Sequence, residues 1–236
     1  MPPGVRSLTT TRAGGVSAPP YDTLNLGAHT GDTAAAVAMN RRRLMERAGL
    51  PESPRWLEQV HGAGVVAAHR IRAGAVADAA WTDRSGVVCA VLTADCLPVI
   101  LAACDGAAVA VVHAGWRGLA AGVLEAAVAA MPVPARQLAA WLGPAIGGAA
   151  FEVGPEVRAR LLKADPGAAP TCFAPGQGDR WYADLYGLAR RRLSAAGVAA
   201  IAGGGRCTYT EEACFFSHRR DGRTGRMATL VYREEP

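Results

Sequence analysis

The longest apolar stretch of the chain covers residues 87–114 and has the sequence VVCAVLTADCLPVILAACDGAAVAVVHA. Asp95, Pro98, Asp105 and His113 interrupt this stretch, so it does not fit a membrane-spanning helix. Short apolar runs separated by turn-forming residues are typical of buried strands. The stretch therefore predicts three buried strands joined by turns, at residues 87–93, 99–103 and 107–112.

Helical patterns are found on both sides of these strands. The first covers residues 33–48, with Asp32 as the expected N-cap and Gly49 as the expected stop. An apolar helix is expected at residues 119–131. Two more helices are expected, one opened by Pro155 and one capped by Asp184, because proline and aspartate suit helix starts.

Further strands are expected at residues 56–60, 139–142 and 228–232, and residues 164–178, rich in Pro and Gly, are expected to form a surface loop. Strands and helices alternate irregularly, which predicts an α/β or α+β mixed fold. We expect one domain over residues 1–236, with layered mixed sheets and flanking helices.

Composition excludes several classes of protein. Half of the 236 residues are hydrophobic and 19% are charged, as in globular proteins. The net charge of +5 favours anionic ligands, but the arginine runs at 41–43 and 190–192 fall in helical patterns and are expected to be solvated faces. We therefore expect no nucleic-acid partner. No secretory signal is apparent and the six cysteines form no C-x-x-C pair, which favours a cytoplasmic location and no membrane association.

Three residues with metal-binding side chains lie at the ends of predicted strands or in the turns between them. His61 and His113 each follow an apolar run, and Cys96 lies between two such runs. Two imidazoles and a thiolate suit Zn(II), with copper as a second choice, and three ligands leave a coordination position open, as in catalytic zinc sites. The same residues also fit hydrogen-bonded strand ends and a small buried thiol, and their spacing does not separate the two interpretations.

The segment 113–118, His-Ala-Gly-Trp-Arg-Gly, leads into a predicted helix. Its free amides and Arg117 could bind an anion such as phosphate, although a plain strand-to-helix turn fits equally well. Cys96 could also act as a nucleophile with His113 as its base. A zinc-bound thiolate is quenched as a nucleophile, so the two roles exclude each other.

Several phrases of the sequence recur, in this order, in one bacterial family. They are Arg12-Ala-Gly-Gly-Val-Ser, Leu24-Asn-Leu-Gly, Gln59-Val-His-Gly, Thr93-Ala-Asp-Cys-Leu-Pro-Val, His113-Ala-Gly-Trp-Arg-Gly, Trp141-Leu-Gly-Pro-Ala-Ile-Gly, Phe151-Glu-Val-Gly, Ala183-Asp-Leu-Tyr and Phe215-Phe-Ser-His-Arg-Arg-Asp-Gly-Arg-Thr-Gly-Arg-Met-Ala. Over nearly its whole length the chain resembles the laccase-domain family, also called multicopper polyphenol oxidase-like or purine nucleoside phosphorylase-like. One departure is His218, where relatives commonly have Tyr.

The resemblance implies zinc bound by His61, Cys96 and His113, and a layered fold distantly similar to toxin deamidases that use a Cys–His pair. It also implies phosphorolysis of adenosine, inosine, guanosine and methylthioadenosine, and deamination of adenosine to inosine. The expected partners are therefore purine nucleosides and phosphate, bound by a monomer or small homo-oligomer.

On this basis we predict four substrate-binding residues, Arg12, Asn25, Gly115 and Arg117. Arg117 is also expected to take part in catalysis, together with Cys96 and His113. Asp95 is expected to orient a metal ligand or to act as a general acid or base, unless it is a turn carboxylate without a role.

Three other functions remain open at this stage. One is a non-catalytic metal-binding or interaction protein, against which the open coordination position argues, since structural zinc usually has four ligands. A multicopper oxidase needs a mononuclear and a trinuclear copper site, together roughly ten histidines, whereas the chain has five. Only weak phenol oxidation by one copper ion in the three-ligand site would then fit. Some members of the family are linked to the editing of peptidoglycan precursors, which would require a metal-free cysteine amidase instead.

Overall fold

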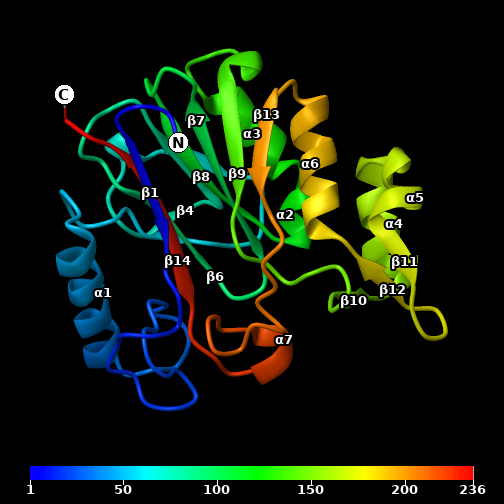
Figure 1. The fold of residues 1–236 in the computed structure, drawn as a ribbon, viewed down its shortest axis with the longest axis horizontal. Helices are drawn as coiled ribbons and strands as arrows, with labels where there is room; N and C mark the ends of the chain where they lie inside the picture. Colours follow the sequence, from blue (N-terminus) through cyan, green and yellow to red (C-terminus); the bar gives the residue numbers. More distant parts are fainter. Residues whose placement is uncertain (236) are drawn as a thin grey trace.

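Two β-sheets pack face to face at the centre of the computed structural model, which describes residues 1–235 (Figure 1). The larger sheet has the order β13 (Ala200–Gly203), β9 (Leu138–Leu142), β7 (Leu97–Ala103), β8 (Val109–Ala114), β5 (Ala79–Thr82) and β3 (Val65–Ala67). The smaller sheet has the order β1 (Val5–Thr9), β14 (Met227–Arg233) and β6 (Cys89–Thr93), and its strands are antiparallel. The larger sheet is mixed, since only the pairs β13–β9 and β3–β5 are parallel.

The space between the two sheets is filled by the apolar stretch that dominates the sequence. Val91 of β6 faces Ile100 of β7 and Val111 of β8 in one buried cluster. Every residue of β6, β7 and β8 is buried, because each of these strands is covered on both faces. The three predicted strands are confirmed, but β8 continues through His113 to Ala114.

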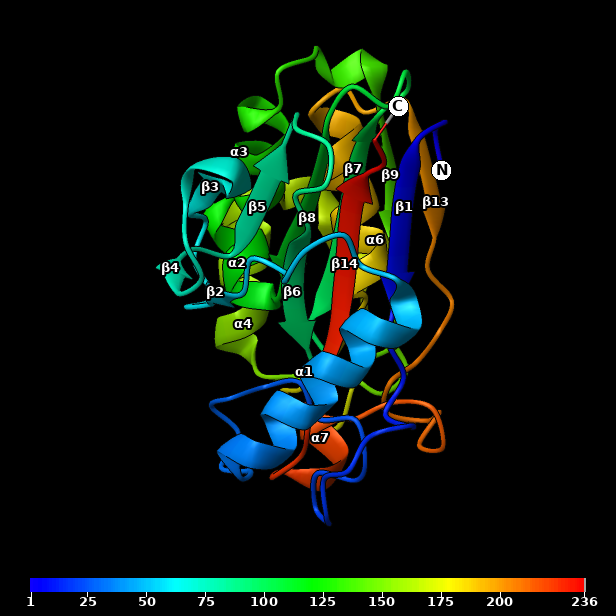
Figure 2. The same ribbon diagram turned by 90° about the vertical axis from the view of Figure 1, so that its left-hand side faces the viewer.

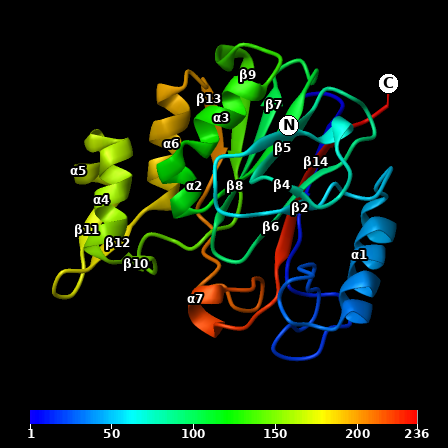
Figure 3. The same ribbon diagram turned by 180° about the vertical axis from the view of Figure 1, so that it is seen from behind.

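Helices cover the outer faces of both sheets. The outer face of the larger sheet is covered by α2 (Trp116–Ala121), α3 (Val123–Ala130) and α6 (Leu185–Ala195), and α4 (Pro155–Ala164) packs outside them against α2 (Figure 3). On the other side α1 (Ala34–Ala48) lies over the smaller sheet, where Leu44 packs with Ala90 and Leu230 (Figure 2). The mixed α/β prediction is therefore confirmed, with helices, sheet, sheet and helix as successive layers.

Small elements complete the described chain. They are the antiparallel sheet β10 (Glu152–Val153), β12 (Trp181–Ala183) and β11 (Phe173–Pro175), the parallel pair β2 (Leu57–Glu58) and β4 (Ala75–Val76), the short helices η1 (Ala68–Arg70), η2 (Ala135–Gln137), η3 (Pro166–Ala168) and α5 (Ala169–Cys172), and α7 (His218–Asp221). The segment 164–178 was expected to be a loop, but it contains η3, α5 and β11. The strand expected at 56–60 is only the two residues of β2.

Two helix predictions need correction. The N-cap of α1 is Thr33, whose hydroxyl accepts a hydrogen bond from the Ala36 amide, while the carboxylate of Asp32 accepts one from Ser17. The helix expected at 119–131 is two helices, because Gly122 has a left-handed backbone conformation with φ of 89°. The helix starts at Pro155 and Asp184, the stop at Gly49 and the closing strand are confirmed.

The arginine runs are less solvated than expected. Arg41 lies 4.3 Å over the ring of Trp56 and donates to the carbonyl of Leu26, and Arg191 forms an ion pair with Asp165 at 2.7 Å. All six cysteines carry free thiols. Of the described helices, none combines the length and the apolar character needed to cross a bilayer.

Candidate metal centre

The structure brings His61, Cys96 and His113 together at one end of the two sheets. Their ligand atoms all lie within 4.8 Å of one another. His61 follows β2, Cys96 comes directly before β7, and His113 lies near the end of β8. Because Pro98 of β7 pairs with His113, the start of β7 lies beside the end of β8, which places Cys96 next to His113.

Two residues of this centre have a backbone conformation that is rare outside glycine. His61 has a φ of 59° and Asp95, directly before Cys96, a φ of 88°. Such conformations cost free energy and persist only where the surroundings hold them in place. Backbone strain is therefore concentrated at the turns that carry two of the three ligands.

Asp78 holds the two histidines from behind. It is fully buried, and its Oδ1 accepts hydrogen bonds from His113 Nδ1 at 2.8 Å and from the His61 amide at 2.9 Å. Its Oδ2 accepts from the Gly62 amide at 2.7 Å. A carboxylate on the second ring nitrogen fixes the orientation of a metal-binding histidine and leaves Nε2 free for the metal. Asp78 was not among the residues predicted from the sequence, although a lone aspartate in the apolar segment 75–82 indicates a buried carboxylate with a partner.

The charges of the centre are strongly coupled. Burial raises the pKa of the Cys96 thiol, but the charge of His113 and hydrogen bonds from His113 and His61 outweigh it and bring that pKa down to about 6. Burial lowers the pKa of His113, but the Cys96 charge and the hydrogen bond with Asp78 raise it to about 9. Without a metal, the directions of these two shifts favour a thiolate on Cys96 and an imidazolium on His113 at neutral pH.

Arg226 is a positive side chain coupled to Cys96, and His29 and Arg41 lie near it. Burial lowers the pKa of His29, and the charges of Arg226, Arg41 and His61 lower it further, so these groups lie close to one another. Burial also lowers the pKa of Arg226, against the opposing charges of Cys96 and Asp95. The centre thus combines a soft metal-binding set with a guanidinium that can attract an anion.

Gly115 separates Cys96 from the start of α2. A Cβ at this position would lie 2.8 Å from Cys96 Sγ and 3.4 Å from His61 Cδ2, so the ligands leave no room for a side chain. Arg117, in the first turn of α2, is exposed and stacks 4.5 Å over the ring of Trp116. Two of the four predicted substrate-binding residues, Gly115 and Arg117, therefore lie beside the centre or in the helix that follows it.

The other predicted residues have structural partners. Asn25 is fully buried, and its amide bonds to Thr30, Asp32 and the main chain, so its side chain cannot touch a substrate in this structure. Arg12 donates to the main-chain carbonyl and the carboxylate of Asp22. The carboxylate of Asp95 accepts hydrogen bonds from the Thr208 hydroxyl and the Arg219 amide. Orientation of a metal ligand was one of the two roles predicted for Asp95, and the carboxylate that bonds the ring of His113 is Asp78.

The residues present fit a single zinc ion. Two neutral imidazoles and a thiolate form a borderline-soft donor set of the kind that zinc prefers, and three ligands leave a position open. His61 is exposed, so this position is accessible to small molecules. Within residues 1–235, His61, Cys96 and His113 form the one cluster of three or more side chains able to hold a metal.

Comparisons with known proteins agree on one family. The family model described as multi-copper polyphenol oxidoreductase laccase matches residues 6–234. A protein of Escherichia coli K12 named purine nucleoside phosphorylase YfiH is 51% identical, with 98% of this chain and 95% of that protein covered. A Pseudomonas aeruginosa protein named purine nucleoside phosphorylase PA4543 is 52% identical, with 99% and 96% covered.

Solved structures share the fold. The crystal structure of protein NMB0706 from Neisseria meningitidis is 47% identical and superposes with a TM-score of 0.95, covering 99% of this chain and 96% of that one. The crystal structure of YlmD from Geobacillus stearothermophilus is 35% identical, with a TM-score of 0.92 and coverage of 99% and 93%.

Proposed function

Because the chain belongs to the multi-copper polyphenol oxidoreductase laccase family, we propose that it is a purine nucleoside phosphorylase with one zinc ion at His61, Cys96 and His113. Relatives about half identical to it over nearly their full length carry the name purine nucleoside phosphorylase. The observation that carries the proposal is the convergence of the three ligands in front of Asp78. We include deamination of adenosine as a second reaction of the same centre.

In phosphorolysis, a phosphate oxygen forms a bond to C1′ of the ribose while the bond from C1′ to the purine nitrogen breaks. Bound zinc would supply an electrophile at the open position. Arg226 lies close enough to Cys96 and Asp95 for their charges to act on it, which suits the binding of phosphate beside the ligands. We propose that Gly115 and Arg117 also contact the substrate, and that Arg12 and Asn25 act by holding the N-terminal loops.

Zinc is favoured over a copper cluster by the number of ligands. Five histidines are too few for the sites of a multicopper oxidase, and three side chains suit one ion. Copper in the same site, with weak oxidation of phenols, is an alternative that metal analysis of the purified protein would reveal.

The test combines metal analysis with a phosphate-dependent assay. Inosine and adenosine are incubated with the metal-loaded protein, with and without phosphate, and released base and inosine are separated by chromatography. We expect one zinc per chain, and base release only with phosphate. Cys96→Ser should lose both zinc and activity, whereas Cys104→Ser, which changes an exposed thiol outside the centre, should keep both. Stoichiometric zinc without base release or inosine formation would overturn the proposal.

A second candidate is favoured by the Cys96–His113–Asp78 arrangement itself. A thiolate, an imidazolium and a buried carboxylate behind the imidazole match the order of groups in thiol hydrolases. Such an enzyme would be an amidase, with peptidoglycan precursors as its suggested substrates. Chelation separates the two, because a thiolate amidase should retain its activity without metal and the zinc enzyme should not.

A further inference from the structure

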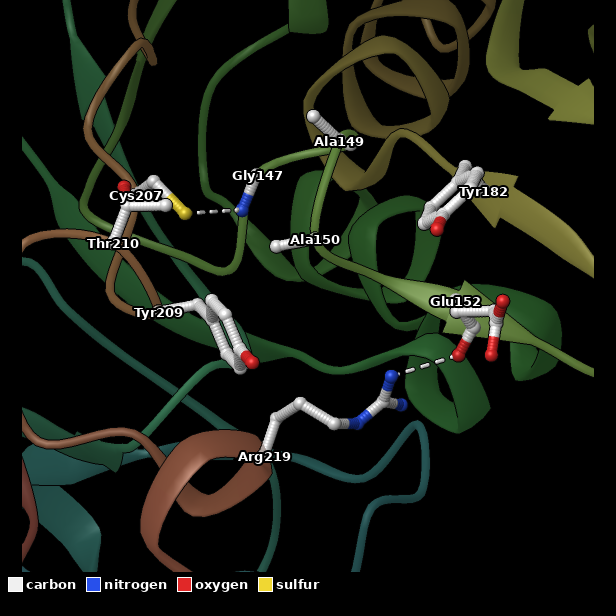
Figure 4. Close-up of a pocket in the computed structure, with 10 residues that line it drawn as sticks. Gly147, Ala149, Ala150, Glu152, Tyr182, Cys207, Tyr209, Thr210 and Arg219 are labelled. Atoms are coloured by element: carbon white, nitrogen blue, oxygen red, sulfur yellow. Dashed lines mark hydrogen bonds between the residues drawn. The ribbon is translucent and has the colours of Figure 1, made fainter. Parts of the chain in front are cut away.

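A pocket of about 590 Å³ is lined by none of the three metal ligands (Figure 4). It adjoins the metal centre through Arg219, whose main-chain amide donates to Asp95, the residue before Cys96. Its walls are the loop at 147–150, Glu152 of β10, Tyr182 of β12, the segment 207–210 and Arg219 of α7. Its volume falls in the range of pockets that bind drug-sized molecules, about 300–1,000 Å³. The proposed function does not use this pocket.

Two tyrosines give the pocket aromatic surfaces. The rings of Tyr182 and Tyr209 both point into it from opposite walls (Figure 4). Tyr209 is 37% exposed, which is high for a large hydrophobic side chain. Within residues 1–235 neither hydroxyl has a hydrogen-bond partner, so both rings and both hydroxyls are available to a ligand. Planar bases stack on such rings with little dependence on sequence or substituent.

Arg219 supplies a positive charge to the lining of the pocket. Its Nη1 donates to the main-chain carbonyl of Glu152 at 2.8 Å, and its guanidinium lies 5.3 Å from the ring centroid of Phe151. In the described chain its other donors have no acceptor. The neighbouring Arg220 is different, because Asp221 and three main-chain carbonyls occupy its guanidinium. Arg219 is thus held in place with donors to spare, as suits an anion.

We propose that this pocket is a second ligand site and that it binds a nucleoside monophosphate. The base would stack against Tyr209 or Tyr182, and the phosphate would be bound by Arg219. The carboxylate of Glu152, which also lines the pocket, would accept hydrogen bonds from the ribose hydroxyls. This proposal does not rest on the phosphorylase activity and would stand without it.

The pocket is attached to the metal centre through Asp95. The two oxygens of its carboxylate accept hydrogen bonds from Thr208 Oγ1 at 2.6 Å and from the Arg219 amide at 2.7 Å. Its main-chain carbonyl accepts from Ile146, next to the 147–150 loop. Asp95, the residue before Cys96, therefore bonds three segments that form the pocket. Because the pocket and the metal centre share this residue, an experiment must distinguish a ligand in the pocket from a ligand at the metal.

Cys207 offers a native reporter inside the pocket. Its Sγ accepts a hydrogen bond from the Gly147 amide at 3.2 Å. Burial raises the pKa of this thiol, but hydrogen bonds from Thr210 and from main-chain amides outweigh it and lower the pKa. Thiolates react readily with iodoacetamide, so occupancy of the pocket can be followed by alkylation of Cys207. The exposed Cys104 lies outside this pocket and serves as an internal control.

The experiment measures alkylation of Cys207 in the full-length, metal-loaded protein by peptide mass spectrometry, while AMP is titrated. At an AMP concentration of about four times Kd, the rate at Cys207 should fall about fivefold, and the rate at Cys104 should not change. Adenosine, which lacks the phosphate, and ribose 5-phosphate, which lacks the base, should protect less. Tyr209→Ala and Arg219→Met should abolish most of the protection; Arg219→Met keeps the main-chain amide that bonds Asp95.

Three results would overturn the proposal. The first is no protection of Cys207 at any AMP concentration. The second is equal protection in Tyr209→Ala and Arg219→Met variants whose thermal unfolding matches that of the parent. The third is protection that disappears in Cys96→Ser, because the ligand would then be at the metal centre. Retained protection in a Cys96→Ser protein that has lost phosphorolysis would support the second site and keep the two proposals separate.

Discussion

The substitution Asp78→Asn removes one negative charge from behind the metal centre while keeping the size of the side chain. Asp78 accepts from His113, from the His61 amide and from the Gly62 amide, and all of these partners are donors. An asparagine has only one acceptor oxygen, so its NH₂ group must face a donor in either orientation. Loss of such a partner typically weakens metal binding about 10- to 100-fold.

The size of the loss should depend on pH, because Asp78 also acts on His113. Burial lowers the pKa of His113, but the Cys96 charge and the Asp78 hydrogen bond raise it to about 9. Zinc binds neutral imidazole, so below that pH zinc must displace a proton from His113. Without the Asp78 charge the pKa of His113 falls, so near neutral pH zinc competes with a less tightly bound proton. Each unit by which this pKa falls regains about tenfold in zinc affinity near neutral pH and so offsets part of the loss. The loss should therefore be larger above pH 9 than at neutral pH.

Competition titrations with a zinc indicator, at neutral pH and above pH 9, measure this difference directly. Asp83→Asn is the matched control, because Asp83 lies 3.5 Å from His69 in a histidine–aspartate pair outside the centre. We expect zinc affinity in that variant to match the parent at both values of pH. An equal loss of affinity at both values in Asp78→Asn, or no loss at all, would refute this account of Asp78.

Three further predictions follow from the same structure. Gly115→Ala should lower zinc occupancy and cost about 1–3 kcal/mol of stability, because the new Cβ would lie 2.8 Å from Cys96 Sγ. Gly64→Ala is the control, because the nearest atom to its new Cβ would be 3.5 Å away. Unchanged zinc affinity in Gly115→Ala would contradict the predicted crowding. Zinc binding between pH 6 and 9 should release about one proton, from His113, because Cys96 is already a thiolate in this range. Calorimetry in buffers of different ionisation enthalpy measures the number of protons released. Binding without proton release would show that His113 is neutral before zinc binds. Asn40→Ala should lower the free energy of unfolding, measured by urea titration, by about 3 kcal/mol. The reason is that the fully buried Asn40 amide forms hydrogen bonds with four groups of the N-terminal loops. A loss under about 1 kcal/mol would show that Asn40 does not stabilise these loops.

The central strands could be predicted from sequence because burial on both faces leaves a continuous apolar run. The ends of those strands could not be predicted, because they are set by hydrogen-bonded pairing with neighbouring strands and not by hydropathy. His113 looks like the residue after a strand, yet its pairing with Pro98 of β7 keeps it inside β8. The same strand register places Cys96 beside His113. No local sequence pattern contains this proximity, because it depends on how β7 and β8 pair.

The candidate site was only partly visible in the sequence. His61, Cys96 and His113 stand out because few residue types bind metals and each lies in or beside a turn. Asp78 did not stand out, because its partners are main-chain amides and a histidine far away in the chain. Asn25 was expected to bind substrate but braces a loop, and both tasks require the same polar groups.

The separation of the ligands along the chain has a consequence for how the protein matures. His113 takes its place only when β8 has paired with β7 and β5, and Cys96 only when the turn between β6 and β7 has formed. In the unfolded chain the three side chains are far apart, and bringing them together carries the entropy cost of closing two long loops. We therefore expect the ion to enter a nearly finished fold instead of nucleating it. A cell short of metal would then accumulate folded, unloaded protein that can be activated later without new synthesis.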